Sequence, residues 1–415
     1  MNTRDDFNVA ISDWLDDQAG RGAPDYVDEI LVRTTRTRQR PAWSSLERWL
    51  PMQTTLSFAT VPRIAWLLVV IALLAAAVVA VVVVGSQTRQ LPPPFGLARN
   101  GAIIYGGSDQ DIHRLDPLTG VTTALINGLP RDGSPSLSPD GTKFFFLRDS
   151  DVSSDGGRVA TVMVANVDGS NVRDVTGVLT DMHDPVWSHD GTRIAVATDL
   201  NGGPPSRIRM FSVDGSTPPR VIDIGDTEAI YLAFRPGDRE LTFRGQGLFA
   251  VGTDGSGLRT ILAPGDGDYA SLSPDGTKIA YQVWDGTTGT IHVINVDTGA
   301  DSIPSIDRGT TTGLIDDSPT WSPDGSRLLF VRYHGAGGYR LAVVPATGGS
   351  VVEIGPSMPS NETRSLAQFS PDGTAVMAYF QADQSTWMVD PTGSVPDVQL
   401  PATIAEQASW QRLAP

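Results

Sequence analysis

The sequence predicts an all-β protein whose largest domain is a β-propeller. A short motif recurs along the chain: an apolar anchor residue, then Ser-Pro-Asp-Gly or a close variant, then a β-rich run. The anchors follow one another at intervals of 38 to 50 residues, which is the period of a propeller blade. In addition, the region before the first motif lacks one strand that the C-terminus can supply. The anchors are Leu137, Trp187, Phe234, Leu272, Trp321 and Phe369.

Each repeat reads as a four-stranded meander. In the clearest copy, residues 269–273, 278–283 and 290–296 are three strands, and a weaker outer strand follows them. The Pro-Asp-Gly turns have a physical cause: proline presets φ, aspartate can bind the backbone ahead of it, and glycine accepts positive φ. Pairs such as Asp168-Gly169 lack the alternating oxygen ligands of a calcium loop, so we interpret them as hairpin turns.

The two ends of the repeat region predict how the ring closes. Six motifs supply six blades, and residues 102–105, 111–115 and 121–125 precede them as three strands without an inner partner. Residues 408–410 read as the start of another inner strand, and Trp410 follows the last anchor by nearly one blade period. We therefore expect a seven-bladed propeller closed by the C-terminal strand, because closure removes exposed sheet edges.

The repeats resemble those of the TolB-like family and, more loosely, WD-like repeats and the propeller domains attached to prolyl oligopeptidases. The resemblance covers about residues 101–410 and is carried by the segments SLSPDGTK, VWSHDGTR, TWSPDGSR and QFSPDGTA. It implies a propeller scaffold and, by analogy with TolB, a partner-binding role. TolB has six blades, whereas seven are expected here, which separates the two.

The second strong feature is residues 64–84, which contain no charged side chain. At about 1.5 Å per residue, a helix of this length spans roughly 31 Å, the thickness of a bilayer core. A cleaved signal peptide is the alternative, but the length of the apolar run favours an uncleaved signal anchor. Arginines are concentrated before the segment, so the positive-inside rule predicts a cytoplasmic N-terminus and an extracytoplasmic propeller at a bacterial cell membrane.

The expected organisation has four parts: a cytoplasmic helical segment (residues 1–62), a transmembrane helix (63–85), a Pro-rich stalk (86–96) and the propeller (97–415). Apolar residues at helical spacing predict short helices in the first part. These helices are either a membrane-proximal patch or, within residues 1–50, a docking element for a cytoplasmic partner. The order of the parts resembles membrane-bound anti-sigma regulators, although the zinc-binding His and Cys residues of many of them are missing.

Composition excludes several classes of site. The chain contains no cysteine, so disulfides, thiolate catalysis and Cys-based zinc sites are ruled out. Its formal net charge is −16. An exported domain this acidic is a poor candidate for binding nucleic acid, whose phosphates require basic side chains, and we expect no nucleic-acid partner.

Acidic residues recur three to five positions before the anchors, on the side of the ring where the connections between strands are long and irregular. We expect their carboxylates at the mouth of the central channel, as a candidate ligand site: Asp132, Asp184, Asp268, Asp317 and Glu406. Clustered carboxylates attract cations, so Ca²⁺ is the candidate cofactor, with His183, Asp184 and Asp317 as candidate metal ligands. The alternative is that these residues are separate, solvated strand caps.

Three classes of function remain. The favoured one is a membrane-anchored binding or sensory module without catalysis, which takes an envelope protein, a peptide or another ligand on the open propeller face. The second is a metal-dependent hydrolase or lyase at the cell surface, although the sequence has no Gly-x-Ser-x-Gly elbow and no His-rich metal motif. The third is an anti-sigma-like transmembrane regulator.

Overall fold

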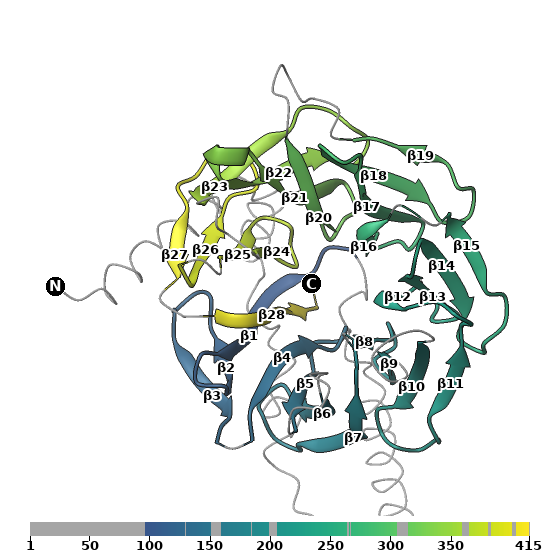
Figure 1. Cartoon of the computed structure of the whole chain (residues 1–415). Coiled ribbons are helices and arrows are strands. Elements are labelled where there is room, and N and C mark those ends of the chain that lie inside the picture. Colours follow the sequence, from purple (N-terminus) through teal and green to yellow (C-terminus); the bar gives the residue numbers. More distant parts are fainter. Residues whose placement is uncertain are drawn as a thin grey trace, which may run out of the picture. The chain divides into compact units, whose positions relative to one another are not determined.

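In the computed structural model, small sheets are arranged in a ring (Figure 1). The structure describes residues 96–414 except 129, 151–158, 184, 199–205, 264, 266, 305–313, 359–364, 381–382 and 401–403, and it does not describe the side chains of residues 365, 366, 405 and 406. Within the described residues the regular structure is β, apart from one 3-10 turn, η3 (Gly335–Gly337). The predicted all-β class is therefore confirmed.

Most repeats form one four-stranded antiparallel meander each, as predicted. The first three contain β4 (Asp132–Leu137), β5 (Lys143–Asp149), β6 (Val159–Asn166) and β7 (Arg173–Thr180); β8 (Val186–Trp187), β9 (Arg193–Thr198), β10 (Arg207–Ser212) and β11 (Arg220–Asp223); β12 (Ile230–Phe234), β13 (Glu240–Arg244), β14 (Leu248–Gly252) and β15 (Arg259–Leu262). The last of the four-stranded repeats contains β24 (Ser365–Phe369), β25 (Val376–Phe380), β26 (Ser385–Val389) and β27 (Val398–Leu400).

Two repeats are joined into one eight-stranded sheet. Its halves are β16 (Asp268–Leu272), β17 (Lys278–Trp284), β18 (Gly289–Asn295) and β19 (Asp301–Ser302), and then β20 (Ile315–Trp321), β21 (Arg327–Tyr333), β22 (Tyr339–Pro345) and β23 (Val352–Met358). The halves pair only through a single parallel bridge between Gly289 and Ile315.

The ring closes through the C-terminal strand, as the sequence predicts. The strand β28 (Ile404–Leu413) pairs antiparallel with β1 (Arg99–Gly107), which continues to β2 (Ile112–Leu115) and β3 (Thr122–Ile126). Ile103 is opposite Trp410 in this pairing, so the last anchor-like residue occupies the inner strand of a sheet whose other three strands come from the start of the domain. The sequence around Trp410 is therefore an inner strand, in agreement with the prediction.

The Ser-Pro-Asp-Gly motifs form one recurring hydrogen-bond pattern. In every intact copy, and in the copy with His189 in place of proline, the serine hydroxyl donates to the aspartate Oδ1 at 2.6 Å. The same hydroxyl accepts the backbone N–H of the residue five positions later, at or just before the start of the next strand, at 2.9–3.0 Å. The glycine has φ between 65° and 72°, which explains why this position takes glycine. We call the side of the ring that carries these turns the turn face.

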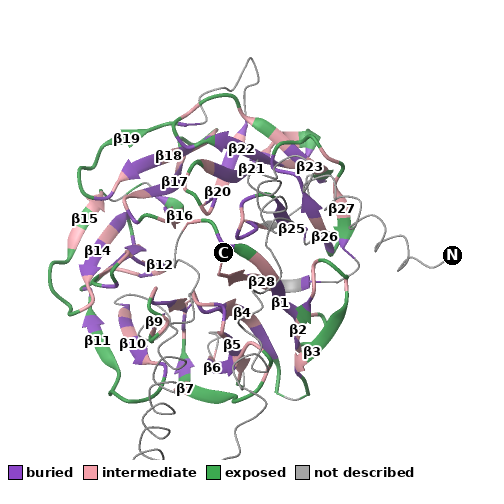
Figure 2. Cartoon of the chain, turned by 180° about the vertical axis from the view of Figure 1, so that it is seen from behind, coloured by how far each residue is buried: buried purple, intermediate pink, exposed green. Residues whose placement is uncertain are grey.

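The aromatic anchors pack between neighbouring sheets. Trp187 and Trp321 are buried, and each indole N–H donates to a carbonyl on the preceding inner strand, Ser136 O or Ser271 O, at 3.0 Å. Arg327 reaches forward to the next sheet, where its guanidinium lies over the Phe369 ring and donates to a turn carbonyl at 2.7 Å. Figure 2 shows the burial pattern: middle strands such as β5, β9 and β25 are mostly buried, and outer strands such as β3 and β11 are more exposed.

The predicted cytoplasmic segment (1–62), transmembrane helix (63–85) and most of the stalk (86–96) lie outside the described residues. In the part of the chain that the structure describes, no helix is long and apolar enough to cross a membrane. The predicted anchor and its topology therefore stay predictions.

Candidate functional site: the central channel

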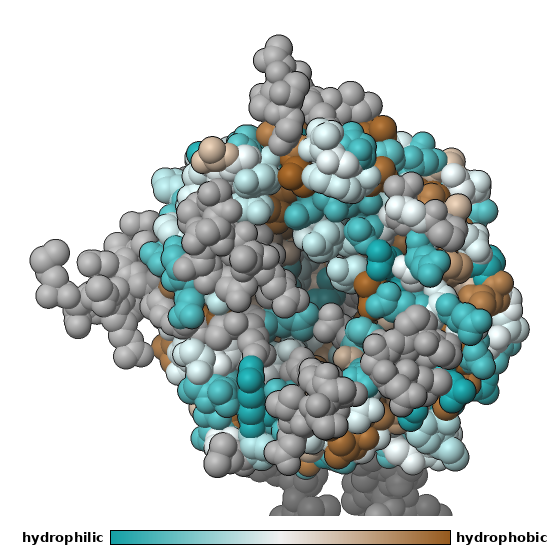
Figure 3. All heavy atoms as spheres, in the orientation of Figure 1, coloured by the Kyte–Doolittle hydropathy of each residue, from teal (hydrophilic) through white to brown (hydrophobic). Residues whose placement is uncertain are grey.

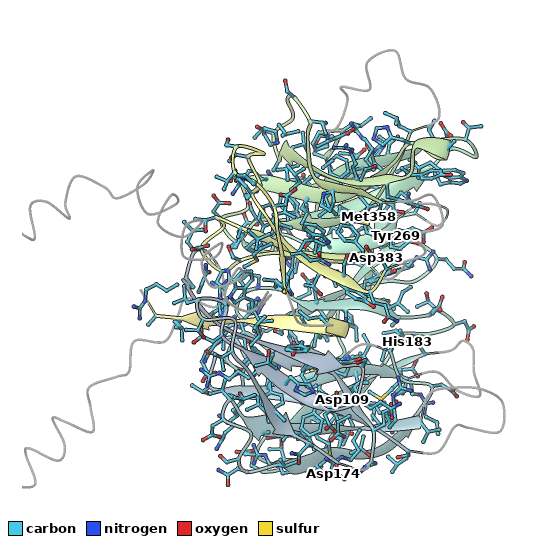
Figure 4. The ribbon with its side chains drawn as sticks, turned by 90° about the vertical axis from the view of Figure 1, so that its left-hand side faces the viewer. Asp109, Asp174, His183, Tyr269, Met358 and Asp383 are labelled. Carbon is cyan, nitrogen blue, oxygen red and sulfur yellow. The ribbon has the colours of Figure 1, made fainter. Side chains whose placement is uncertain are left out.

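The inner strands surround a cavity of about 540 Å³ on the axis of the ring. Its walls come from β4, β8, β12, β16, β24 and β28 and from segments next to them. It opens on the face opposite the turn face, which we call the loop face; Figure 3 looks onto this face, and the hollow lies near its centre. Figure 4 shows Asp109, His183, Tyr269 and Asp383 along this same side of the ring.

The described lining of this cavity contains no charged side chain. Its polar groups are hydroxyls and amides, and its apolar groups include Phe145, Leu232 and Met377; the polar residues are Ser136, Tyr231, Ser271, Gln368, Tyr379, Thr386, Gln407 and Ser409. Two of these polar side chains tie neighbouring inner strands together: the Gln368 amide donates to Ala408 O at 2.7 Å, and the Ser409 hydroxyl accepts Leu137 N–H at 3.0 Å. The channel is thus a neutral, hydrogen-bonding environment in a strongly acidic chain.

A β-bulge recurs in four inner strands at the mouth of the channel. In each, the residue three positions before the anchor has a positive φ of 50–52°: Ser134, Tyr231, Tyr269 and Ser318. Such a φ is unusual for tyrosine, and a bulge re-aims the side chain that it carries. The rings of Tyr231 and Tyr269 lie 6.3 Å apart, and the two residues are 40% and 42% exposed.

The acidic side chains of the predicted ring lie in different environments. Asp132 is only 3% exposed, and its carboxylate forms two hydrogen bonds of 2.8 Å with the Arg148 guanidinium. Asp268 is exposed and pairs with Arg244. Neither residue lines the 540 Å³ cavity, so their charges are compensated beside the channel rather than gathered in it.

Asp317 lies in β20, partly buried and next to Asp316. Burial, together with the neighbouring charge of Asp316, raises the pKa of Asp317 to about 6, although a hydrogen bond from Ser318 opposes the shift. Asp317 does not line the 540 Å³ cavity either. The pKa of this carboxyl group therefore lies closer to neutral pH than that of an ordinary aspartate.

Sequence reasoning missed the most buried ion pair, Asp316–Arg332. Asp316 is fully buried, and Arg332 donates two hydrogen bonds to it at 2.7 and 2.9 Å. Asp316 lies five residues before the anchor Trp321, and Asp132 lies five residues before Leu137; both partner arginines lie eleven residues after the same anchors. This shared spacing is the signal that would have identified both pairs.

The remaining candidates are only partly described. Asp184 lies outside the described residues, and Glu406 lies within β28, but its side chain is not described. The backbone N–H of His183 donates to Ala197 O at 2.9 Å. Among the described side chains, no group of three or more His, Asp or Glu residues could hold a metal ion. The Ca²⁺ site, with His183, Asp184 and Asp317, stays a prediction.

On the turn face the channel continues into a second cavity of about 440 Å³, which shares Leu232 and Gln368 with the first. His189 lines this end. Its backbone N–H donates to the carboxylate of Asp238 at 2.9 Å, and its ring lies 2.8 Å from the same carboxylate. His189 is therefore more than a replacement for the turn proline: it joins two neighbouring repeats.

Comparison with solved structures supports the β-propeller fold. A periplasmic gluconolactonase from Pseudomonas aeruginosa superposes with a TM-score of 0.52 at 14% identity, over 75% of this chain and 99% of that one. A puromycin-hydrolyzing peptidase from Mycobacterium tuberculosis gives 0.50 at 17% identity, over 68% of this chain and 49% of that one. TolB from Acinetobacter baumannii gives 0.47 at 14% identity, over 76% and 81%.

No family model matches the chain, and its sequence matches no curated protein. The fold assignment rests on the gluconolactonase and the peptidase, whose TM-scores are 0.50 or higher. At these identities the likeness concerns the fold alone.

Proposed function

We propose that this chain is a membrane-anchored, extracytoplasmic propeller of the TolB-like type that binds a ligand in its central channel and does not transform it. The observation that carries the proposal is the 540 Å³ channel cavity, which is open on the loop face and lined by hydroxyl and amide side chains but by no described acid, base or histidine. A cavity of this size and character suits binding, whereas catalysis needs groups that move protons or hold a metal.

The proposal includes seven blades. The eight-stranded sheet counts as two blades, because its halves meet through one bridge only. Seven apolar clusters of described residues support this count, since each lies between two neighbouring four-stranded units. One of them joins β25 and β26 to β1 and β28, across the closure of the ring.

The chain enters the propeller on the turn face, which supports a particular exposure of the channel mouth. Arg412 donates to Gly96 O at 2.6 Å, and the N–H of Ala98 donates to Pro371 O at 2.9 Å, in a turn of the turn face. A stalk of residues 86–95 after a membrane span would therefore reach the turn face first. The loop face and the channel mouth lie on the side of the propeller opposite this junction, which would leave them open to ligands or envelope partners.

Single-cysteine labelling tests the topology, because the natural chain has no cysteine. Thr260→Cys lies on an exposed strand position of the propeller, and Ser45→Cys lies in the predicted cytoplasmic segment. In intact cells, a membrane-impermeant maleimide should label the first variant and not the second. Labelling of Ser45→Cys alone would reverse the orientation, and labelling of neither before lysis would place the propeller in the cytoplasm.

Ligand capture tests the binding role. The full-length protein in nanodiscs is incubated with small-molecule fractions of the cell envelope, and its thermal unfolding is followed. A saturable rise in melting temperature is expected, and Ala233→Phe, which fills the channel, should abolish it. No stabilising fraction would contradict the binding role. Chemical conversion of the captured compound would favour the enzyme alternative instead.

A further inference from the structure

We propose that the channel binds a neutral, hydroxyl-rich molecule of mono- or disaccharide size, with the Thr386 hydroxyl as its buried hydrogen-bonding contact and Tyr231 and Tyr269 as the aromatic surface at the mouth. This inference rests on the proposed binding function and names its ligand class. Three separate features of the described residues support it: an orphaned hydroxyl, the lack of charge in the 540 Å³ cavity, and the tyrosine pair.

The orphaned hydroxyl belongs to Thr386, in β26. The residue is 1% exposed, and its Oγ1 has no hydrogen-bond partner among the described residues. It lines a recess of the channel cavity together with Met377, Tyr379 and Ile404, between the β24–β27 sheet and β28. A buried hydroxyl without a partner is unfavourable, so an occupant that offers a hydroxyl or carbonyl oxygen gains an interaction that is already desolvated.

The lack of charge selects the ligand class. A charged ligand would lose its hydration in the 540 Å³ cavity without meeting a described counter-ion, because the lysine, arginine, aspartate and glutamate side chains with described positions do not line that cavity. Arg412 lines only the second cavity, on the turn face. A hydroxyl-rich neutral molecule exchanges hydrogen bonds to water for hydrogen bonds to Ser136, Ser271 or Gln407 at no such cost. The neutral lining therefore discriminates against the acids and amines of the same molecular size.

The tyrosine pair supplies the apolar part of the recognition. Both residues hold φ near 51° in bulged inner strands of neighbouring repeats, and both are exposed at the mouth. A tyrosine ring offers an apolar face and a polar tip. A sugar ring offers the complement, an apolar C–H face bordered by hydroxyls. A bulge that positions an aromatic side chain at an unfavourable φ is typical of a functional position.

The test uses the full-length protein in nanodiscs and isothermal titration calorimetry. The neutral probes are glucose, galactose, N-acetylglucosamine, maltose and cellobiose; the charged probes are glucuronate, glucosamine and glucose 6-phosphate; acetyl-trialanine amide represents a neutral peptide. At least one neutral sugar should bind, and its charged analogue should bind at least tenfold more weakly. Thr386→Val, which keeps the shape of the side chain, and Tyr231→Ala should each weaken binding about tenfold.

Thr123→Val is the matched control, because Thr123 is exposed on the outer strand β3, away from the channel; it should bind as the natural chain does. Equal binding of the charged analogues, binding of the peptide alone, or full binding by a folded Thr386→Val protein would overturn the inference. If no sugar binds but an envelope fraction still stabilises the protein through the channel, only the ligand class is wrong. If neither binds, the proposed function fails as well.

Discussion

The turn face and the channel of this propeller use polar side chains in different ways. On the turn face, each motif aspartate accepts a serine hydroxyl at 2.6 Å, so its charge is committed to the local geometry of a turn. In the 540 Å³ cavity of the channel, the described lining is uncharged, and the buried hydroxyl of Thr386 has no described partner. The acidic side chains of the turns and ion pairs thus already have hydrogen-bonding partners, whereas the channel contains a buried hydroxyl without a described partner.

Removing residues 404–415 should produce the largest effect on either region. The deletion takes away β28, which pairs with β1, forms a wall of the channel and carries the buried Trp410. The ring would lose its closure and expose the edge of β1. We expect no cooperative unfolding transition by circular dichroism. A truncated protein with an unchanged melting curve would show that closure contributes nothing to the fold.

Arg332→Leu should have the next largest effect, because it leaves the fully buried Asp316 without its partner. Breaking a buried pair costs about 3–5 kcal/mol of unfolding free energy. Arg148→Leu is the matched control: its partner Asp132 is buried, but the arginine itself is 28% exposed, so water can compensate part of the loss. Urea unfolding measures both variants. Equal, small losses would mean that the Asp316 pair does not stabilise its repeat.

Asp317→Asn should change stability in the opposite direction. Burial raises the pKa of Asp317 to about 6 in the folded protein, above its unfolded value near 3.8. The folded state therefore binds the proton more tightly, and stability falls as pH rises from about 4 to about 6 and remains lower above that. Removing the charge should stabilise the protein at pH 7 by up to about 3 kcal/mol. It should also flatten the pH dependence of the melting temperature between pH 4 and 7; an unchanged pH profile would contradict the assignment.

The turn face could be predicted from the sequence, and the channel could not. Pro, Asp and Gly at fixed offsets determine a turn by local backbone preferences, and the closing strand around Trp410 follows from the blade period. The direction of a side chain on the inner strands depends instead on bulges. A bulge between Asp317 and Thr320 breaks the simple alternation, so alternation alone does not reveal that Asp316, rather than Asp317, carries the buried pair. Only the five-residue spacing from the anchor, which Asp316 shares with Asp132, points to it.

The channel lining escaped prediction for a related reason. Its polar residues come from five inner strands and from β25 and β26, which are spread along the sequence, and the type of each residue is common. No local motif distinguishes Thr386 from an ordinary strand threonine. Its significance depends on the absence of a hydrogen-bond partner within the described structure, which only the packing of β26 against β28 reveals.

Asp324→Ala tests how much the charge of a turn aspartate contributes to the stability of the fold. Burial alone would raise the pKa of Asp324, but hydrogen bonds from Ser322 and Ser326 outweigh it and hold the pKa below the usual value. Its contribution is therefore present above pH 4 and is lost as the pH falls through the folded pKa. The substitution should cost about 1–2 kcal/mol at pH 7, as the loss of a capping aspartate does. The cost should shrink in acid; the same loss at pH 2.5 and pH 7 would contradict this role of the charge.

His189→Pro should have the smallest effect, because it restores the residue found in the intact motifs. The substitution removes the N–H and the ring that contact Asp238, which costs about 1 kcal/mol or somewhat more. The backbone of the turn is the same as in the proline-containing copies, with Gly191 donating to Ser188 O at 2.9 Å, so proline stiffening returns about 0.4–1 kcal/mol. Asp238 also keeps its hydrogen bond from the N–H of Asp190 at 2.9 Å. A net change within about 1 kcal/mol in urea unfolding is expected; a loss near that of Arg332→Leu would show that the His189–Asp238 contact, and not the turn alone, holds these two repeats together.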